Sequence, residues 1–392
     1  MSRVLLVCPE PLGHGQPAGI GIRFLEIEKV LKSDGHAVTL LSPPIAAEDL
    51  LRLSNDADVA IVQGHIANDF FANARPIPTV VDLYDPFIIE NLHYYQSRGA
   101  EVFTHDHATL LNSLLRADFF LCASEAQRLF WLGMMLAAGR VNPIAFDSDP
   151  NLHSLIRIVP FGVPPPRERA AATEPRVLFG GIYDWYDPIL AIDAVALARA
   201  SLPKISLTFT NHPNPELTPQ GKTAEALQYV KKRGYQSFVR FEPWFEYERR
   251  AEFFDRFALA LLTFPQSLET ELSMRTRVYD YLWGGLPIVT SSAPGTDELL
   301  TGYRCGTVVQ SSSPRAFADA LLQTFAQQTA MQAGARDFVR EHQWPEALRP
   351  LREFCGKPCV DSNKEAFAVR MQVPERPPSI LARLKRRIGG PS

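Results

Sequence analysis

The stretch SLETELSMRTRVYDYLWGGLPIVTSS, residues 267–292, joins a charged beginning to an aromatic middle and a short apolar end. Glu269, Glu271, Arg275 and Arg277 are clustered in its first half. A helix that only packs against a core does not need so many charges so close together. We therefore expect a binding site where this helix begins. The alternative is a surface helix decorated with Arg–Glu pairs.

Residues 265–271 are expected to form a loop. Ser273 is a good N-cap, so the helix is expected to begin at Met274 or Arg275. Its free N–H groups and the positive end of its dipole would face a cleft. Arg275 and Arg277 add charge there, and guanidinium groups match phosphate oxygens well. This predicts an anion site, most simply for a diphosphate. Arg275 is closest to the free N–H groups and is expected to matter most. The two arginines lie about 200° apart on a helix, so one of them can instead pair with a neighbouring acid.

Apolar runs alternate with helical stretches on both sides of this segment, as in α/β proteins. The expected strands are 4–8, 37–41, 59–62, 79–82 and 119–122, then 177–181, 205–210, 239–241, 259–262, 287–290 and 306–309. The proline-rich stretch 160–176 is expected to be an interdomain linker. The sequence therefore predicts two doubly wound, Rossmann-like domains with parallel sheets that face a central cleft.

Composition limits the class of protein. The chain has 392 residues, enough for two domains, with 46% hydrophobic and 21% charged residues. Its net charge of −3 gives no electrostatic reason to expect nucleic acid as a partner. No apolar run reaches the ~20 residues that span a bilayer. Five cysteines without a framework fit a reducing cytoplasm, and no metal site is completed by His or Cys.

A glycine-rich loop follows the first expected strand, in the stretch GHGQPAGIGIR, residues 13–23. Its glycine spacing is not that of the dinucleotide fingerprint, which disfavours a nicotinamide dehydrogenase. The position of the loop, between a strand and a helix expected over residues 22–33, suits backbone contact with a ligand. We expect that contact at Gly19 and Gly21, where a Cβ would interfere.

The segment DYLWGGLPIV, residues 280–289, resembles the donor-binding segment of retaining nucleotide-sugar glycosyltransferases of the GT-B fold, glycosyltransferase family 4. In that family two acids separated by seven residues precede a Gly-x-Pro-Val-Val turn and strand. Asp280 takes the place of the second acid, which implies contact with the nucleotide ribose. Leu272 stands where the first acid belongs. Glu271 is one residue off and is preferred for the sugar contact, with Glu269 as its rival.

Other stretches carry the resemblance along the chain. The stretch VLFGGIYDW, residues 177–185, resembles the glycine-rich strand end of the donor domain, which implies that Gly180 and Gly181 lie near the donor phosphates. Residues 17–41 resemble the opening of the family. Residues 117–143 and 185–188 resemble a bacterial subgroup associated with surface-polysaccharide synthesis.

The sequence also departs from the family. Many members have a His at the end of a first-domain strand, where this chain has Tyr84 and Asp85. The usual Lys after the second-domain glycine strand is missing. Either Trp185 and Asp187 replace it structurally, or the phosphate contact falls wholly on Arg275 and Arg277. His65 ends another strand and can face an acceptor. Trp244 follows a strand and can stack on a nucleobase, although a packed aromatic side chain is an equal alternative.

The resemblance implies transfer of a sugar from a nucleotide-diphosphate sugar to the hydroxyl of a glycan, lipid-linked or small-molecule acceptor, with retained configuration, in bacterial polysaccharide or glycoconjugate synthesis. The catalytic candidates are Glu271, Glu269, Arg275 and Asp85, and the donor-binding candidates include Ser273 and Met274. No cofactor or metal is expected. The alternatives are a GT-B sugar-nucleotide epimerase and a non-catalytic sugar-nucleotide or glycan-binding protein.

The resemblance also sets domain boundaries. Residues 1–165 are the expected acceptor domain, 166–345 the expected donor domain, and 346–392 a helix that crosses back to the first domain and ends in a basic tail. The tail SILARLKRRIGG, residues 379–390, is short and partly amphipathic, so only weak contact with anionic lipid is expected. The expected location is the cytoplasm, with the inner face of the membrane as an option.

Overall fold

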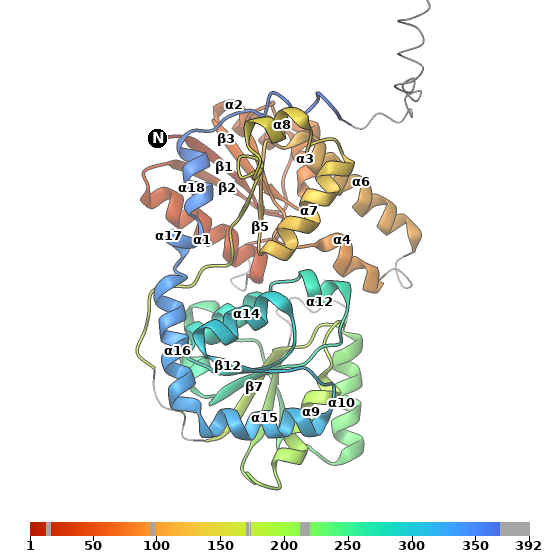
Figure 1. The fold of residues 1–392 in the computed structure, drawn as a ribbon, viewed down its shortest axis with the longest axis vertical. Helices are drawn as coiled ribbons and strands as arrows, with labels where there is room; N and C mark the ends of the chain where they lie inside the picture. The colour runs from red at the N-terminus through yellow and green to blue at the C-terminus, as the bar shows by residue number, and fades with distance from the viewer. Residues whose placement is uncertain (13–16, 95–98, 170–171, 173, 212–219, 369–392) are drawn as a thin grey trace, which may run out of the picture.

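The computed structural model describes residues 1–12, 17–94, 99–169, 172, 174–211 and 220–368, and these form two α/β domains built around two parallel sheets (Figure 1). The first domain contains β1 (Arg3–Val7), α1 (Gly19–Ser33), β2 (Ala37–Leu41), α2 (Ala47–Asp56), β3 (Val59–Gln63), α3 (Ile66–Asn73), β4 (Thr79–Asp82), α4 (Phe87–Glu90), η1 (Asn91–Tyr94), α6 (Ala100–Arg116), β5 (Phe119–Cys122), α7 (Glu125–Ala137), α8 (Pro143–Ser148) and β6 (Ile156–Ile158).

The second domain contains β7 (Arg176–Gly181), α9 (Pro188–Ala198), β8 (Ser206–Thr210), α10 (Gly221–Arg233), β9 (Val239–Glu242), η2 (Tyr247–Arg249), α11 (Arg250–Asp255), β10 (Leu259–Leu262), α12 (Leu268–Leu272), α13 (Thr276–Trp283), β11 (Ile288–Ser291), α14 (Pro294–Tyr303), β12 (Gly306–Val309), α15 (Pro314–Ala326) and α16 (Gln328–Glu341). The chain ends in α17 (Trp344–Ala347) and α18 (Arg349–Gly356).

Within the described residues each sheet has six strands, and every pairing between them is parallel. The strand order is β2-β1-β3-β4-β5-β6 in the first sheet and β12-β11-β10-β7-β8-β9 in the second. Two doubly wound domains were predicted, and this part of the prediction is confirmed. The short strand β6 was not predicted.

The buried apolar runs explain why these strands lie inside. In β1, Leu5 and Val7 pack into one core, whereas Val4 and Leu6 pack into another. Successive side chains of a strand point to opposite faces, so helices must cover both faces of this sheet. None of the helices in the described residues combines the length with the apolar composition needed to span a membrane.

The C-terminal helices connect the two domains. Helix α16 lies along the second domain, and the chain then continues to α17 and α18 beside the first (Figure 1). There Arg352 forms an ion pair with Asp34 at 2.6 Å, and the rings of Phe354 and Phe119 stack with centroids 4.7 Å apart. These contacts join residues more than 200 positions apart along the chain, counted from 119 to 354.

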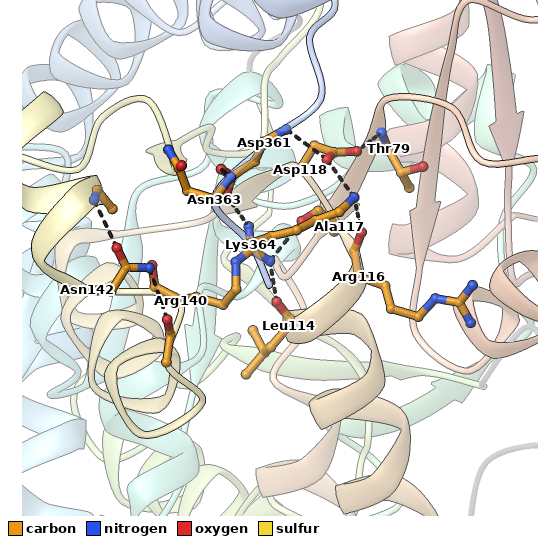
Figure 2. Close-up of polar contacts among 12 residues, drawn as sticks. Thr79, Leu114, Arg116, Ala117, Asp118, Arg140, Asn142, Asp361, Asn363 and Lys364 are labelled. Atoms are coloured by element: carbon orange, nitrogen blue, oxygen red, sulfur yellow. Dashed lines mark hydrogen bonds and ion pairs between the residues drawn. The ribbon is translucent and has the colours of Figure 1, made fainter. Parts of the chain in front are cut away.

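After α18 the chain returns over the first domain and is held there by a polar network (Figure 2). Arg140 is buried and donates to the carbonyl oxygens of Leu114 and Ala117. Its guanidinium also forms an ion pair with Asp361 at 2.8 Å. Asp118 accepts hydrogen bonds from the Asp361 backbone N–H at 3.0 Å and from the Lys364 ammonium at 2.8 Å. Buried charges need such partners, so the network fixes the path of residues 357–368. The basic stretch 379–390 lies outside the described residues.

Two expectations about helix boundaries are wrong. The segment 265–271, expected as a loop, contains α12, which the Ser267 hydroxyl caps by accepting from the Thr270 N–H at 3.2 Å. Ser273 therefore follows α12 instead of capping α13, and α13 begins at Thr276. Helix α1 begins at Gly19, earlier than the expected residue 22, because the Glu10 carboxylate accepts from two N–H groups at its N-terminus.

Candidate active site between the two sheets

The two sheets reverse their strand order at corresponding places, between β1 and β3 in the first and between β7 and β10 in the second. Ligands of open α/β sheets bind beyond the carboxyl ends of strands at such points. Here both points border one cavity of about 410 Å³, which we call the main cavity. The first domain lines it with Glu10, Gln63 and Asp85, among others, and the second with Glu269 and Arg275.

A narrower cavity of about 70 Å³ lies next to the main cavity and shares Ala18, Gly19, Tyr183, Thr276 and Arg277 with it. We call it the inner cavity. Its other lining residues include Gly180, Gly181, Trp244, Tyr247 and Asp280. The two cavities together bring most of the predicted donor-binding residues to one place.

Glu269 and Arg275 form a buried ion pair at the edge of the main cavity. Their charged groups are 2.8 Å apart, and the side chains are 2% and 4% exposed. The Arg275 guanidinium also lies 3.9 Å from the centre of the Phe264 ring. Both charges are therefore fixed in position, and the carboxylate cannot move far from the arginine.

The two candidate first acids lie in different surroundings. Glu269 is buried and lines the main cavity, whereas Glu271 is exposed and does not line it. Residues two apart on a helix point about 200° away from each other, and both acids lie on α12. A shift of one residue therefore cannot bring Glu271 to the position that Glu269 occupies.

Arg277 lies at the junction of the main and inner cavities. It donates to the carbonyl oxygens of Gly181 at 2.7 Å and Phe179 at 3.4 Å, and its guanidinium lies 4.6 Å from the Tyr186 ring centre. Backbone carbonyls are neutral, so the positive charge of Arg277 is not cancelled by them. Arg275, which was expected to matter most for an anion, is instead neutralised by Glu269.

Carboxyl groups of the first domain face the same cavity. Burial raises the pKa of Asp85 to about 6, although a hydrogen bond from Glu90 opposes the shift. Burial and the nearby Asp85 charge raise the pKa of Glu90 well above its usual range. At neutral pH the pair therefore holds a proton on Glu90 and a negative charge on Asp85.

Asp280 lies at the inner cavity, 3.8 Å from the Arg250 side chain. Burial raises the pKa of Asp280 to about 6, and the positive charge of Arg250 opposes the shift. Trp244 lines the same cavity, and its ring stacks on that of Phe245 with centres 4.8 Å apart. An acid and an aromatic ring thus line one narrow space.

The sequence matches no protein-family model and no curated protein. Solved structures are nevertheless similar over most of the chain. HepE from Anabaena is 14% identical and aligns with a TM-score of 0.65 over 91% of this chain and 100% of its own. Sucrose-phosphate synthase from Thermosynechococcus elongatus is 14% identical, with a TM-score of 0.64 over 90% and 98% of the two chains. The fold is GT-B.

A third GT-B structure, TarM of S. aureus, is 12% identical and aligns with a TM-score of 0.56 over 76% of this chain. This chain spans 55% of the length of TarM. At such identities the likeness shows the fold. The GT-B architecture expected from the sequence is therefore confirmed.

Two glycines of this GT-B chain are explained by contacts inside the protein. A Cβ on Gly19 would lie 3.0 Å from the Thr276 hydroxyl of the second domain, and one on Gly21 would lie 2.9 Å from the Glu10 carboxylate. Gly19 thus lets the two domains approach each other. Because Glu10 already accepts from the Gly21 N–H, this part of the glycine loop does not present a free donor to a ligand, contrary to expectation.

Gly180 and Gly181, the other two glycines expected at the site, are not equally required by the backbone. Gly180 has a φ of +84°, and a Cβ there would collide with the Tyr281 hydroxyl. Gly181 has room for ordinary contact with Trp244 at 3.6 Å. Gly180 is therefore required by the backbone path of the strand end, and both glycines line the inner cavity.

The two acceptor candidates lie in different surroundings. The Tyr84 hydroxyl donates to the Met274 carbonyl oxygen at 2.9 Å, so Tyr84 joins the two domains. Ser273 and Met274 line the main cavity beside it. His65 lies 3.2 Å from Asp106 and borders a third cavity of about 290 Å³ in the first domain. We call this third cavity the annex; Gln63, His65, Ile66, Asp69, Asp85 and Phe87 line it, among others.

The polar residues of the main cavity that sequence reasoning missed include Glu10, Gln63 and Glu90. Glu10 and Gln63 could have been found, because each stands at or just after the carboxyl end of a buried strand. Glu90 ends a four-residue helix, α4, and no local pattern marks it. Among the described residues, no cluster of three or more His, Cys, Asp and Glu side chains is arranged to hold a metal ion.

Proposed function

We propose that this protein is a glycosyltransferase that moves a sugar from a nucleotide-diphosphate sugar to an acceptor hydroxyl. The observation that carries the proposal is the arrangement around Arg277, which has the inner cavity with Asp280 and Trp244 on one side and the main cavity with Glu269 on the other. A nucleotide-diphosphate sugar needs three environments in this order: one for the nucleoside, which the inner cavity offers, one for the diphosphate, at Arg277, and one for the sugar, in the main cavity. HepE, a structural neighbour, has been crystallised with UDP and glucose.

In this proposal the inner cavity takes the nucleoside, with Asp280 accepting from ribose hydroxyls and Trp244 stacking on the base. Arg277 faces the diphosphate. Glu269, fixed by Arg275, accepts from hydroxyls of the donor sugar. The resemblance to glycosyltransferase family 4 supports this order of roles, a retained configuration and a place in bacterial polysaccharide or glycoconjugate synthesis.

The proposed reaction breaks the bond between the anomeric carbon and the diphosphate oxygen, and the electron pair stays on the diphosphate. The acceptor oxygen bonds to the anomeric carbon, and its proton passes to the carboxylate of Asp85. Fixed positive charge lowers the barrier most where negative charge develops, so Arg277 stabilises the departing diphosphate. A pKa of about 6 suits a base that is ionised at neutral pH. The proposed reaction needs no resident metal ion or cofactor.

The proposal is tested first by a screen of UDP-, GDP- and dTDP-sugars for thermal stabilisation and for hydrolysis or transfer. With the donor so identified, Glu269→Gln is expected to lower turnover on the order of 100-fold because it removes charge from the sugar contact. Glu271→Gln, two residues away and exposed, is the matched control and is expected to retain turnover. Equal effects of both variants would contradict the assignment of Glu269.

The pH dependence of donor binding follows from Asp280. A raised pKa means that Asp280 becomes neutral as the pH falls through about 6, so the charge on the ribose contact is lost below that pH. We expect the affinity for the nucleotide sugar to fall about tenfold between about pH 7.5 and pH 5. Asp280→Asn should bind weakly at both pH values and show a flat profile. A nucleotide sugar is the right probe because its diphosphate, esterified at both ends, does not titrate in this range.

A sugar-nucleotide epimerase is the second candidate, favoured by several carboxyl groups on one cavity, among them those of Asp85, Glu90 and Glu269. An epimerase would need acid and base groups in the cleft and no acceptor. The two functions separate in one assay: incubation of the donor without acceptor gives an epimer detected by NMR in one case, and only slow hydrolysis in the other.

A further inference from the structure

Gln63 is a buried polar residue of the first domain whose side chain lacks hydrogen-bond partners among the described residues. It ends β3, is 2% exposed, and lines both the main cavity and the annex. Neither its amide nitrogen nor its amide oxygen has a hydrogen-bond partner in the part of the chain that the structure describes. An orphaned buried amide destabilises a fold, so its presence at the junction of two cavities points to a ligand that supplies the missing partners.

The annex continues the main cavity away from the second domain. The two cavities share Pro9, Ile20, Gln63 and Asp85. A molecule that lies in the annex therefore reaches past Gln63 to the Asp85 carboxylate, which faces the place where we put the donor sugar. The annex lies wholly on first-domain residues, whereas Arg275 and Arg277 belong to the second domain.

The walls of the annex combine an apolar side with a few acceptors and donors. Phe87 and Ile66 supply the apolar side, and the ring of His65 lies 5.0 Å from the ring of Phe87. Gln63 supplies one amide, and Asp69 and Asp85 supply carboxyl groups. An apolar wall with a small number of convergent polar groups suits a polyhydroxylated ring with one apolar face.

The charges around the annex are of one sign. Asp69 and Asp85 are acids, and no Lys or Arg side chain is among the described residues that line it. The nearest first-domain arginine on the main cavity, Arg23, is buried and paired with Asp82 at 2.6 Å, so its charge is already matched. Burial lowers the pKa of His65, which keeps its ring neutral at physiological pH. A negatively charged group in the annex would therefore meet like charges and no partner.

We infer that the annex is the acceptor subsite and that it takes a neutral or amine-bearing sugar, which Gln63 and Asp85 orient, and disfavours acceptors with a carboxylate or phosphate on the bound ring. This inference rests on the proposed transferase function and adds the chemical class of its acceptor. The amide of Gln63 donates to one hydroxyl and accepts from another. Asp69, at the exposed mouth, pairs with an amine where the acceptor carries one.

The first experiment offers the wild-type protein and its donor three kinds of methyl glycoside in the gluco and galacto series: the neutral glycoside, the matching amino sugar glycoside and the matching uronate. Product is detected by mass spectrometry, and release of the nucleoside diphosphate is measured in parallel. We expect the neutral and amino glycosides to be used with a kcat/KM at least about tenfold higher than that of the uronate.

Two variants test the residues. Gln63→Leu is expected to raise the KM for the neutral glycoside about tenfold with a smaller change in kcat, without lowering the melting temperature, because leucine removes the orphaned amide and keeps its volume. Asp69→Lys is expected to lower kcat/KM for the amino glycoside about tenfold relative to the neutral one. Glu48→Lys makes the same change of charge on exposed α2, away from the cavities, and is the matched control with unchanged preference.

The outcomes separate this inference from the proposed function. If no nucleotide sugar is bound or consumed, the transferase proposal fails and the inference fails with it. If a donor is consumed but the uronates are used as well as the neutral glycosides, or no neutral or amino glycoside is used, only the inference is overturned. A Gln63→Leu protein with a lower melting temperature and an unchanged acceptor KM would likewise overturn it, since Gln63 would then be structural.

Discussion

Arg275→Ala is expected to lower the free energy of unfolding by about 3–5 kcal/mol, because it leaves the buried Glu269 carboxylate without its partner. The two side chains are 4% and 2% exposed and 2.8 Å apart, so water cannot replace the arginine. The variant also loses the contact with the Phe264 ring at 3.9 Å. Urea unfolding followed by circular dichroism measures the change.

A matched control is available in the same domain. Arg249 pairs with Glu252 at 2.7 Å, but those side chains are 67% and 69% exposed, so Arg249→Ala should leave the free energy of unfolding almost unchanged. Removing both charges with Arg275→Ala and Glu269→Ala should recover part of the loss, since no unpaired buried charge then remains. An Arg275→Ala protein as stable as Arg249→Ala would contradict a fixing role for Arg275.

The arrangement of strands was readable from the sequence because buried parallel strands are short continuous apolar runs. Runs such as 59–62 and 259–262 are apolar throughout, and both became strands of the expected sheets. Because these runs alternate with stretches of helical periodicity, and crossovers between parallel strands are right-handed, few sheet topologies remained possible. Helix α12 was not predicted, because a five-residue helix is too short to show the hydrophobic periodicity that distinguishes a helix from a loop. With α12 missed, Ser273 was expected to cap the next helix, whereas that helix, α13, has Arg275 at its N-cap position and no side-chain cap.

The sequence predicted which segments form the site, but it predicted fewer of the individual side chains. Strand ends located the cleft, and Asp280, Arg277 and Gly180 do line it. The choice between Glu269 and Glu271 depended on which side of a short helix each acid occupies, and packing of α12 decides that. The orphaned amide of Gln63 depends on distant neighbours, so no local pattern in the sequence could reveal it.

Arg277→Ala is expected to weaken binding of a nucleoside diphosphate by roughly 10- to 150-fold, which corresponds to 1.5–3 kcal/mol for a charge-assisted hydrogen bond to phosphate. The guanidinium is held by the Gly181 carbonyl at 2.7 Å at the junction of the main and inner cavities. No acid among the described residues forms an ion pair with it, in contrast to Arg275, which pairs with Glu269. The diphosphate proposed for this junction therefore depends on Arg277 more than on Arg275.

The measurement is calorimetric and compares UDP or GDP with the matching nucleoside. The nucleoside should bind the Arg277→Ala protein almost as it binds the wild type, because its proposed contacts are with Asp280 and Trp244. Arg240→Ala, which removes an exposed positive charge from β9 outside both cavities, controls for a general loss of attraction to anions. Arg277→Lys should keep part of the affinity, since lysine retains the charge but lacks the planar fork that holds both a carbonyl and a phosphate. If Arg277→Ala and Arg240→Ala weaken diphosphate binding equally, or if the nucleoside loses as much as the diphosphate, then the anion does not bind at Arg277 and the proposed order of nucleoside, diphosphate and sugar across the two cavities is wrong.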